Sequence, residues 1–361
     1  MVDLTNLKVL IERDYSKVLR VRNTLDNFPI YTKESVWQKG RHWSNGYVVG
    51  VNLLWAKLNK KTVPSLQIKS IVEELNINKK EKQFQDVGFI SLYSECLAYE
   101  LGINIDITSL KETVKYLEGC TLTDGSMIVS WKPLGYIGVD QFMNSMVLGW
   151  YALKFRDNHI LNIYTKIIIN SVVKLIDGNT VYEYVDKHGN PQNNNSGSNE
   201  KTWLRGDAWA MVGISYAIYI FSRTKQYEIY TKLLSILNRL CKKQIELFSV
   251  YGYFPGSYPN DMNLNHNTLQ DKSAEAAIGC ALVFLKNKNI LINDNVNFLL
   301  SLIGRNVEKS IGVKEHILNG TSYPLRLIDK ENQCATWGDY YGLRYIQEMI
   351  DGTSKGGLDI I

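Results

Sequence analysis

Apolar residues recur every three or four positions through most of the chain, which is the spacing of helices that bury a face. The clearest stretches are 89–101 (FISLYSECLAYEL), 142–155 (FMNSMVLGWYALKF), 210–221 (AMVGISYAIYIF) and 274–285 (AEAAIGCALVFL). Less apolar helical stretches lie between them, at 162–176 and 229–247, and strand patterns are confined to short pieces at 125–131 and 179–190. The pattern therefore predicts an all-α fold with short β pieces in its loops.

Each strongly apolar helix has a polar residue at its expected start. Five of the starts carry an aspartate, at intervals of 54 to 68 residues: Asp86, Asp140, Asp207, Asp271 and Asp339. A sixth start, counted from Ser44, opens HWSNGYVVGVNLLW. Each interval has room for an inner helix, a loop, an outer helix and a return. We therefore expect six helical hairpins closed into one ring, forming a single domain over residues 1–361, with the inner helices beginning at a common rim.

Taken alone, an aspartate at a helix start is best explained as a cap for the free N–H groups. Capping does not require the arginine and indole groups expected near the same rim, namely Trp43, Trp131, Trp203, Arg205, Trp209 and Trp337. A half-exposed indole is typical of a face that binds something. Carboxylates, one arginine and several indoles around one rim indicate a carbohydrate-binding cleft.

Composition narrows the class of protein. With 361 residues and 45% apolar residues the chain can bury a large core. The net charge of +5 is weak and dispersed, so we expect no nucleic-acid partner. Five cysteines without a CxxC pair favour a reducing compartment and neither disulfides nor a zinc site. Without a signal-peptide pattern at the start or an apolar run of about 18 residues, we expect a cytoplasmic protein that does not bind membranes.

Five motifs in order give the chain a resemblance to a known family: DVGFISLYSECLAYELG, VDQFMNSMVLGWYA, WLRGDAWAMVGISYA, DKSAEAAIGCALVFL and WGDYYGLRYI. Over roughly residues 40–350 the sequence resembles glycoside hydrolase family 88, the unsaturated glucuronyl hydrolases. The resemblance implies an (α/α)6 barrel, no metal and a cytoplasmic role. We also expect no other cofactor, and a monomer or weak homodimer. It also implies removal of the 4,5-unsaturated uronic acid from the non-reducing end of oligosaccharides that polysaccharide lyases leave.

The matching motifs carry the family's functional residues to positions in this chain. By this resemblance Asp140 is the general acid/base and Asp86 is the second essential carboxylate. To hold its proton Asp140 needs a raised pKa, which burial and the charge of Asp86 would supply. Substrate-binding positions follow in the same way: Trp131, Arg205, Trp209 and an aromatic wall from Trp43 or its neighbour Tyr47.

The chain departs from the family pattern at several positions. Asp207 stands where the family usually has glutamine. We expect it to line the cleft, where it would pair with Arg205, bind sugar hydroxyls or repel an anionic neighbouring sugar. Tyr182 stands in place of a histidine. Ser322, with Arg326, lies in a loop that differs from the family's; these two residues either meet a sulfate or carboxylate or are ordinary loop residues. The departures concern the second sugar of the substrate more than the reaction.

Other functions remain open at this stage. The closely related unsaturated rhamnogalacturonyl hydrolases, or another glycosidase on the same barrel, would use a similar constellation. A sugar epimerase would need a pair of histidines at the site, and the chain has only five histidines, mostly in expected loops. A non-catalytic carbohydrate-binding barrel would also be possible if Asp86 and Asp140 were both caps.

Overall fold

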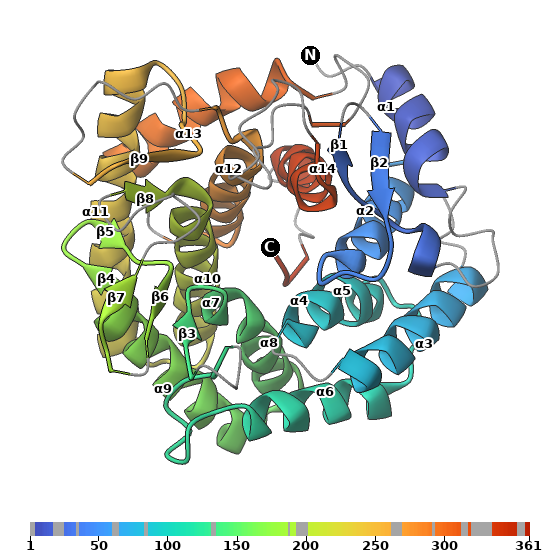
Figure 1. The fold of residues 1–361 in the computed structure, drawn as a ribbon, viewed down its shortest axis with the longest axis horizontal. Coiled ribbons are helices and arrows are strands. Elements are labelled where there is room, and N and C mark those ends of the chain that lie inside the picture. Colours follow the sequence, from blue (N-terminus) through green and yellow to red (C-terminus); the bar gives the residue numbers. More distant parts are fainter. Residues whose placement is uncertain are drawn as a thin grey trace.

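We describe the fold from a computed structural model. It describes residues 4–16, 25–33, 36–59, 65–82, 86–130, 135–186, 188–192, 201–260, 269–290, 293–311, 317–318, 334–351 and 358–361. Figure 1 looks along the barrel and shows the helices as two concentric rings. Among the described residues no helix is both long enough and apolar enough to cross a membrane.

The inner ring contains the helices that are buried on nearly all sides, as their continuous apolar sequences predict. In chain order it comprises α2 (Asn45–Leu58), the segment α4–η4–α5, α7 with α8, α10 (Leu204–Arg223), α12 (Lys272–Asn287) and α14 (Thr336–Asp351). The segment α4–η4–α5 runs through α4 (Val87–Ser91), the π-helical turn η4 (Leu92–Cys96) and α5 (Leu97–Glu100). The next inner helix is divided at Ser145 into α7 (Gln141–Asn144) and α8 (Met146–Phe155).

The outer ring contains amphipathic helices that pack one face against the inner ring. It comprises α3 (Ser65–Lys82), α6 (Ile107–Gly119), α9 (Asn158–Leu175), α11 (Tyr227–Tyr251), α13 (Asp294–Glu308) and, from the start of the chain, α1 (Leu4–Ile11) with the π-helical turn η1 (Glu12–Ser16). Each inner helix contacts the next one, and α14 packs against α2, which closes the ring. The expected (α/α)6 barrel of paired helices is therefore confirmed.

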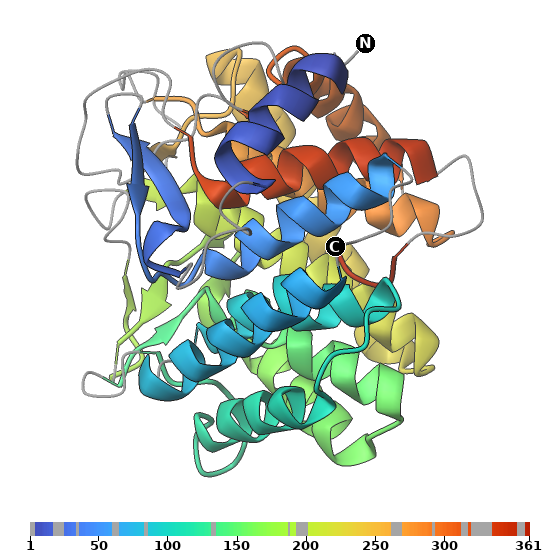
Figure 2. The ribbon, with the colours of Figure 1, turned by 90° about the vertical axis from the view of Figure 1, so that its right-hand side faces the viewer.

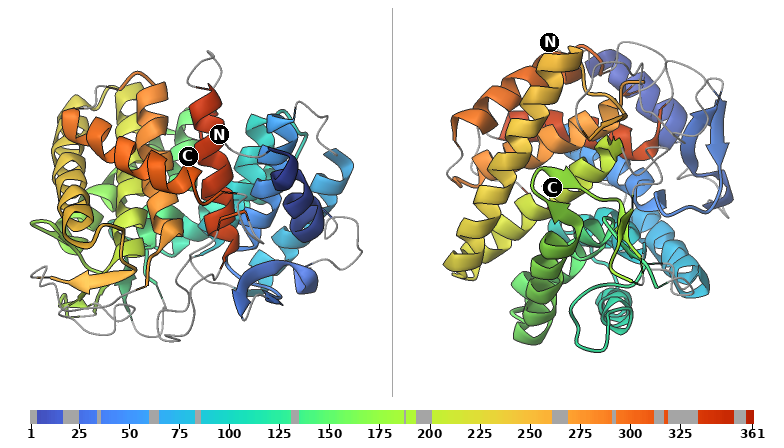
Figure 3. Two further views of the ribbon diagram at one scale, coloured as in Figure 1. Left: turned by 90° about the horizontal axis from the view of Figure 1, so that it is seen from above. Right: turned by 60° about the vertical axis from the view of Figure 1, so that its left-hand side comes forward.

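Short antiparallel strands lie at the end of the barrel where the inner helices begin (Figures 2 and 3). The pairs are β1 (Pro29–Lys33) with β2 (Val36–Lys39), β4 (Ile176–Asp177) with β5 (Thr180–Val181), and β8 (Lys201–Trp203) with β9 (Ser257–Pro259). A three-stranded sheet has the order β3 (Ile137–Gly138), β6 (Tyr184–Val185) and β7 (Pro191–Gln192). A short 3-10 turn, η3 (Leu25–Asn27), precedes β1.

Two of the expected helix starts differ from the observed ones. Asp86, Asp140 and Asp271 immediately precede their helices, but α10 and α14 begin three residues before Asp207 and Asp339. The reason is tertiary, because β8 pairs with β9 up to Trp203 and a β-bridge joins Ala335 to Tyr31. Each helix can begin as soon as that pairing ends.

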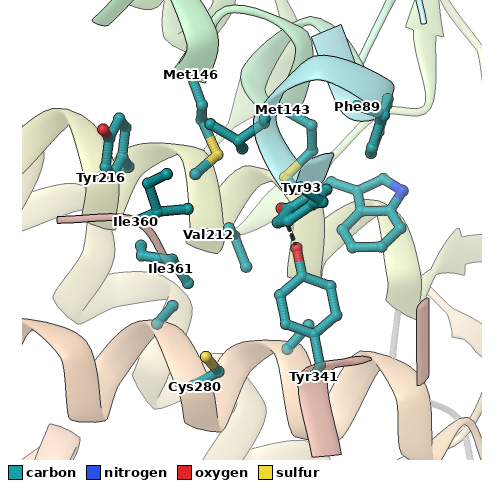
Figure 4. Close-up of a cluster of buried hydrophobic side chains, with 14 of the residues drawn as sticks. Phe89, Tyr93, Met143, Met146, Val212, Tyr216, Cys280, Tyr341, Ile360 and Ile361 are labelled. Atoms are coloured by element: carbon teal, nitrogen blue, oxygen red, sulfur yellow. Dashed lines mark hydrogen bonds between the residues drawn. The ribbon is translucent and has the colours of Figure 1, made fainter. Parts of the chain in front are cut away.

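The centre of the ring is filled by side chains from all around it (Figure 4). Tyr93 and Tyr341 meet there through their hydroxyl groups, at 2.6 Å. Ile360 and Ile361 are fully buried in the same cluster, so the segment 358–361 enters the barrel axis. Tyr219 on α10 donates to Asp359 Oδ1 at 2.7 Å, which anchors this segment near the ends of the inner helices.

Candidate active site

The five aspartates near the inner helix starts have different roles, although their local sequences look alike. Asp271 is a true cap, because its carboxylate accepts hydrogen bonds from the backbone N–H groups of Ser273 and Ala274. Asp339 is buried and accepts from the Tyr15 hydroxyl at 2.5 Å and from the Leu318 N–H at 2.8 Å. Both carboxylates are therefore engaged in holding the fold.

Asp207 is also engaged in the fold, which corrects the expectation that it lines the cleft. Its side chain is fully buried between α10, α11 and β9. Its carboxylate accepts hydrogen bonds from Gln244 Nε2 at 2.8 Å and the Tyr258 hydroxyl at 2.5 Å. Lys243, equally buried, lies 3.4 Å away as its counter-charge. The Asp207 carboxylate is therefore matched by this lysine and by two hydrogen-bond donors in the core.

Asp86 and Asp140 stand apart from the other three. Each occupies the N-cap position of its helix, yet neither carboxylate accepts a bond from the first-turn N–H groups of α4 or α7, both fully described. Asn144, one turn after Asp140, donates from Nδ2 to Asp86 Oδ1 at 3.1 Å. The two aspartates predicted to be catalytic are thus brought together at one rim.

The environment of Asp140 raises the pKa of its carboxyl group well above the usual value. Loss of hydration is the largest cause, and the negative charges of Asp86 and Glu183 add to it, while Arg205 acts in the opposite direction. A carboxyl group that keeps its proton near neutral pH can serve as a general acid. A neighbouring carboxylate that remains ionised can stabilise a cation.

Aromatic rings and one arginine continue the rim beside the aspartates. The half-buried Trp43 stacks on Trp337, with ring centroids 5.0 Å apart. The Arg205 guanidinium lies 5.2 Å from the Trp337 ring and 5.0 Å from the Trp203 ring, and it forms a 2.9 Å ion pair with Asp271. Arg205 is therefore fixed between two indoles, and Asp271 both caps α12 and orients it.

The remaining predicted positions lie beneath the rim, in a nearby loop, or outside the described residues. Trp209 is 2% exposed and packs with its ring centroid 5.8 Å from that of Phe89, under the surface of the rim. Tyr182 is half-buried beside Glu183, between β5 and β6. Trp131 and Ser322, with Arg326, lie outside the described residues.

Two polar residues at this rim were missed in the sequence. Asn144 is a fully buried amide within the otherwise apolar stretch FMNSMVLGW, and that contrast is a signal for it. Glu183 is 7% exposed, and its backbone carbonyl accepts from the Val139 N–H at 2.7 Å, directly before Asp140. The sequence signal for Glu183 is a glutamate between two tyrosines in a short strand pattern.

Comparison with known sequences gives one informative relative. No family model matches the chain. An unsaturated chondroitin disaccharide hydrolase of Streptococcus agalactiae serotype III (strain NEM316) is 25% identical over 243 residues, which are 61% of this chain and 59% of that protein. The matched part of the chain therefore spans less than two thirds of that relative.

Comparison with solved structures covers nearly the whole chain. An unsaturated glucuronyl hydrolase from Bacillus sp. GL1 has a TM-score of 0.78 at 17% identity over 98% of both chains. An unsaturated glucuronyl hydrolase specific for heparin has a TM-score of 0.79 at 16% identity over 96% of both chains. The enzyme from Streptococcus agalactiae has a TM-score of 0.76 at 16% identity over 99% of this chain and 95% of that one. The resemblance seen in the motifs is confirmed at the level of the fold: the chain folds as the unsaturated glucuronyl hydrolases do.

Proposed function

We propose that the protein is a glycoside hydrolase that removes a 4,5-unsaturated uronic acid from the non-reducing end of lyase-generated oligosaccharides of the glycosaminoglycan type. The observation that carries the proposal is the pairing of Asp86 and Asp140, two aspartates at helix starts that cap neither helix. The raised pKa of Asp140 supports the assignment of its role.

The reaction begins with proton transfer to the double bond. An unsaturated uronic acid is a vinyl ether across C4, C5 and the ring oxygen. Asp140 gives its proton to C4, which leaves an oxocarbenium cation at C5 and a carboxylate on Asp140. Asp86, as an anion, stabilises that cation. Both groups thereby act at the point where charge develops.

Water then adds at C5, and Asp140 takes up the proton that the water loses. The resulting C5 hemiketal opens to a ketone, which makes C1 a hemiacetal. The hemiacetal releases the hydroxyl group of the next sugar and becomes an aldehyde. Because water attacks C5 and not the anomeric carbon, the carboxylate separation that distinguishes inverting from retaining glycosidases does not govern this reaction.

The half-buried Trp43 supports binding of a sugar at this rim, because an indole face packs against the apolar face of a sugar ring, and the fully buried Trp337 stacks behind it. Among the described residues none accepts a hydrogen bond from Trp203 Nε1, so this buried donor can serve a ligand. Arg205 lies between the Trp203 and Trp337 rings, with its charge paired to Asp271, and the family resemblance predicts that it contacts the substrate. Trp131, Tyr182, Trp209 and Ser322 remain predicted contacts from the family resemblance.

Two solved structures of aspartate-to-asparagine variants of unsaturated glucuronyl hydrolases support an unsaturated uronic acid as the terminal sugar, because they are described with dGlcA-Glc-Rha-Glc and dGlcA-GalNAc6S as ligands. Only the second of these ligands, which contains an amino sugar, is of the glycosaminoglycan type. Five buried free cysteines fit a reducing compartment, so we propose that the protein is cytoplasmic. We also propose that it acts as a monomer or weak homodimer.

The test is a panel of unsaturated disaccharides from chondroitin, hyaluronan, heparin and rhamnogalacturonan. Hydrolysis is followed by the loss of the ultraviolet absorbance of the C4=C5 bond. We expect turnover of at least one glycosaminoglycan substrate and its loss in Asp140→Asn, with the fold retained by circular dichroism. Activity on the rhamnogalacturonan substrate alone would replace the proposed substrate class, and near-wild-type activity of Asp140→Asn would overturn the mechanism.

A further inference from the structure

Asn144 is a buried amide that connects the starts of two inner helices. It is fully buried at the last position of α7. Its Nδ2 donates to Asp86 Oδ1 at 3.1 Å, and its Oδ1 accepts from the backbone N–H of Phe89 at 3.2 Å. Its own N–H donates to the carbonyl of Asp140 at 2.8 Å. One side chain thus links Asp86 to the helix that carries Asp140.

The orientation of this amide follows from its partners. The N–H of Phe89 can only donate, so the atom that it meets must be the amide oxygen of Asn144. The NH2 group of Asn144 must then face Asp86. A group that can only donate favours the ionised, accepting form of a carboxyl group.

The distance between the two helices is fixed by main-chain contact. A Cβ atom added to Gly88 would lie 2.5 Å from the carbonyl oxygen of Asn144 and 2.6 Å from its Cα atom. Because Gly88 has no side chain, α4 and α7 can approach closely enough for the Asn144 amide to reach Asp86. The packing holds the amide in one place.

We propose that Asn144 is a positioning residue, which holds the Asp86 carboxylate ionised and in a fixed orientation beside Asp140. The inference rests on the proposed function, in which Asp86 must be an anion while Asp140 keeps its proton. The other charged groups that act on Asp140 at this rim are Glu183 and Arg205. Asn144 acts through Asp86 and does not itself react.

The test in the enzyme is Asn144→Asp, which keeps the size of the side chain and the acceptor for the Phe89 N–H. It replaces the amide donor with a second carboxyl group beside Asp86, so the two carboxyl groups cannot both ionise. We expect kcat to fall on the order of 10–100-fold, the effect of losing one hydrogen bond to a charged group. We expect KM to stay within about threefold and the acid limb of the pH profile to move up by about one pH unit or more.

Ser91→Ala is the matched control. Ser91 is buried at the end of α4, the helix that Asp86 precedes. Its Oγ donates to Thr113 Oγ1 on α6 at 3.2 Å, so the substitution removes a buried hydrogen bond that involves neither carboxylate. We expect this variant to lose stability without a shift of the pH profile. An Asn144→Asp enzyme with the wild-type kcat and acid limb would overturn the inference, and so would an equal pH shift in Ser91→Ala.

A second measurement separates this inference from the proposed function. In protein labelled with 13C at the aspartate carboxyl groups, the Asp86 signal is assigned by its absence in Asp86→Asn. We expect its titration midpoint to rise by about one pH unit or more in Asn144→Asp. An unchanged midpoint contradicts the inference, whether or not the wild-type protein hydrolyses any unsaturated disaccharide.

If Asn144→Asp does not fold, the reciprocal double variant Asp86→Asn, Asn144→Asp tests whether the two side chains pair. It restores an amide facing a carboxylate, with the donor on the other helix, and we expect it to fold again while remaining inactive. Failure of the reciprocal variant to recover the fold would contradict the pairing.

Discussion

The buried pair of Asp207 and Lys243 allows a quantitative prediction for the variant Asp207→Asn. Asp207 is fully buried and Lys243 is 3% exposed, and Coulomb attraction acts over 3.4 Å between them. Burial raises the pKa of Asp207 and lowers that of Lys243, and the charge of each partner opposes the shift of the other. Removing the carboxylate leaves an ammonium group in the core without a counter-charge.

Breaking a buried ion pair at one partner costs about 3–5 kcal/mol of folding free energy. An unfolding entropy of about 2.1 cal/mol/K per residue gives about 0.76 kcal/mol/K for a chain of 361 residues. A loss of about 4 kcal/mol then lowers Tm by about 5 °C. The Tyr258 and Gln244 donors still have the amide oxygen of asparagine as an acceptor, so we add no further cost for them.

The measurement is thermal unfolding by circular dichroism at pH 7, with the double variant Asp207→Asn, Lys243→Met as the control. We expect the double variant to recover most of the lost Tm, because it contains no unpaired charge. A single variant within about 1 °C of wild type, or a double variant no more stable than the single one, would show that the charge pair does not act as described. Because Asp207 is fully buried and its carboxylate bonds to Lys243, Gln244 and Tyr258, we also expect kcat/KM of the single variant to stay within a few-fold of wild type below its Tm.

Three further substitutions test the rim and the core. Asp140→Asn should raise Tm at neutral pH as well as abolish activity. The Asp140 carboxyl group keeps its proton in the folded state to a higher pH than in the unfolded state, where the proton is lost near about pH 4. The stability of the wild type therefore falls as the pH rises from about 4 toward the raised pKa, and the variant does not show this loss. Tm–pH curves of the two proteins that stay parallel would contradict this. Burial raises the pKa of Glu275 to about 8, so Glu275→Gln should stabilise the protein by at most about 4 kcal/mol at pH 7 and by less at pH 5. Equal Tm gains at both pH values would point to packing instead. Gly88→Ala should lower the free energy of unfolding by about 1–3 kcal/mol and lower kcat, because its Cβ would meet the Asn144 backbone. In the control Gly119→Ala the added Cβ meets nothing within 4 Å, so Tm should stay unchanged or rise. Equal Tm values for the two variants would show that the helices can move apart.

The ring was predictable because the three-and-four spacing of apolar residues marks the inner helices directly. Helix starts were less predictable where tertiary pairing sets them, as at Trp203, where β8 ends, and at Ala335, where a bridge to Tyr31 ends. Sequence periodicity contains no information about such partners.

The roles of the aspartates could be predicted only in part. Asp86 and Asp140 were identified through family motifs, and the structure brings them together at one rim through Asn144. Asp207 was misplaced because its partners, Lys243 and Tyr258, come 36 and 51 residues later in the chain. Local sequence cannot distinguish a carboxylate that faces a ligand from one that faces a buried lysine.

The segment 358–361 limits the directions from which a ligand can reach the proposed site. Ile360 and Ile361 are fully buried on the axis, and Asp359 is held from the side by Tyr219 and by Lys288, which directly follows α12. Side chains therefore fill the barrel axis at the ends of the inner helices opposite to Asp140. If the protein acts on saccharides as proposed, only the end of an oligosaccharide reaches Asp140, and the product leaves on the side from which the substrate entered.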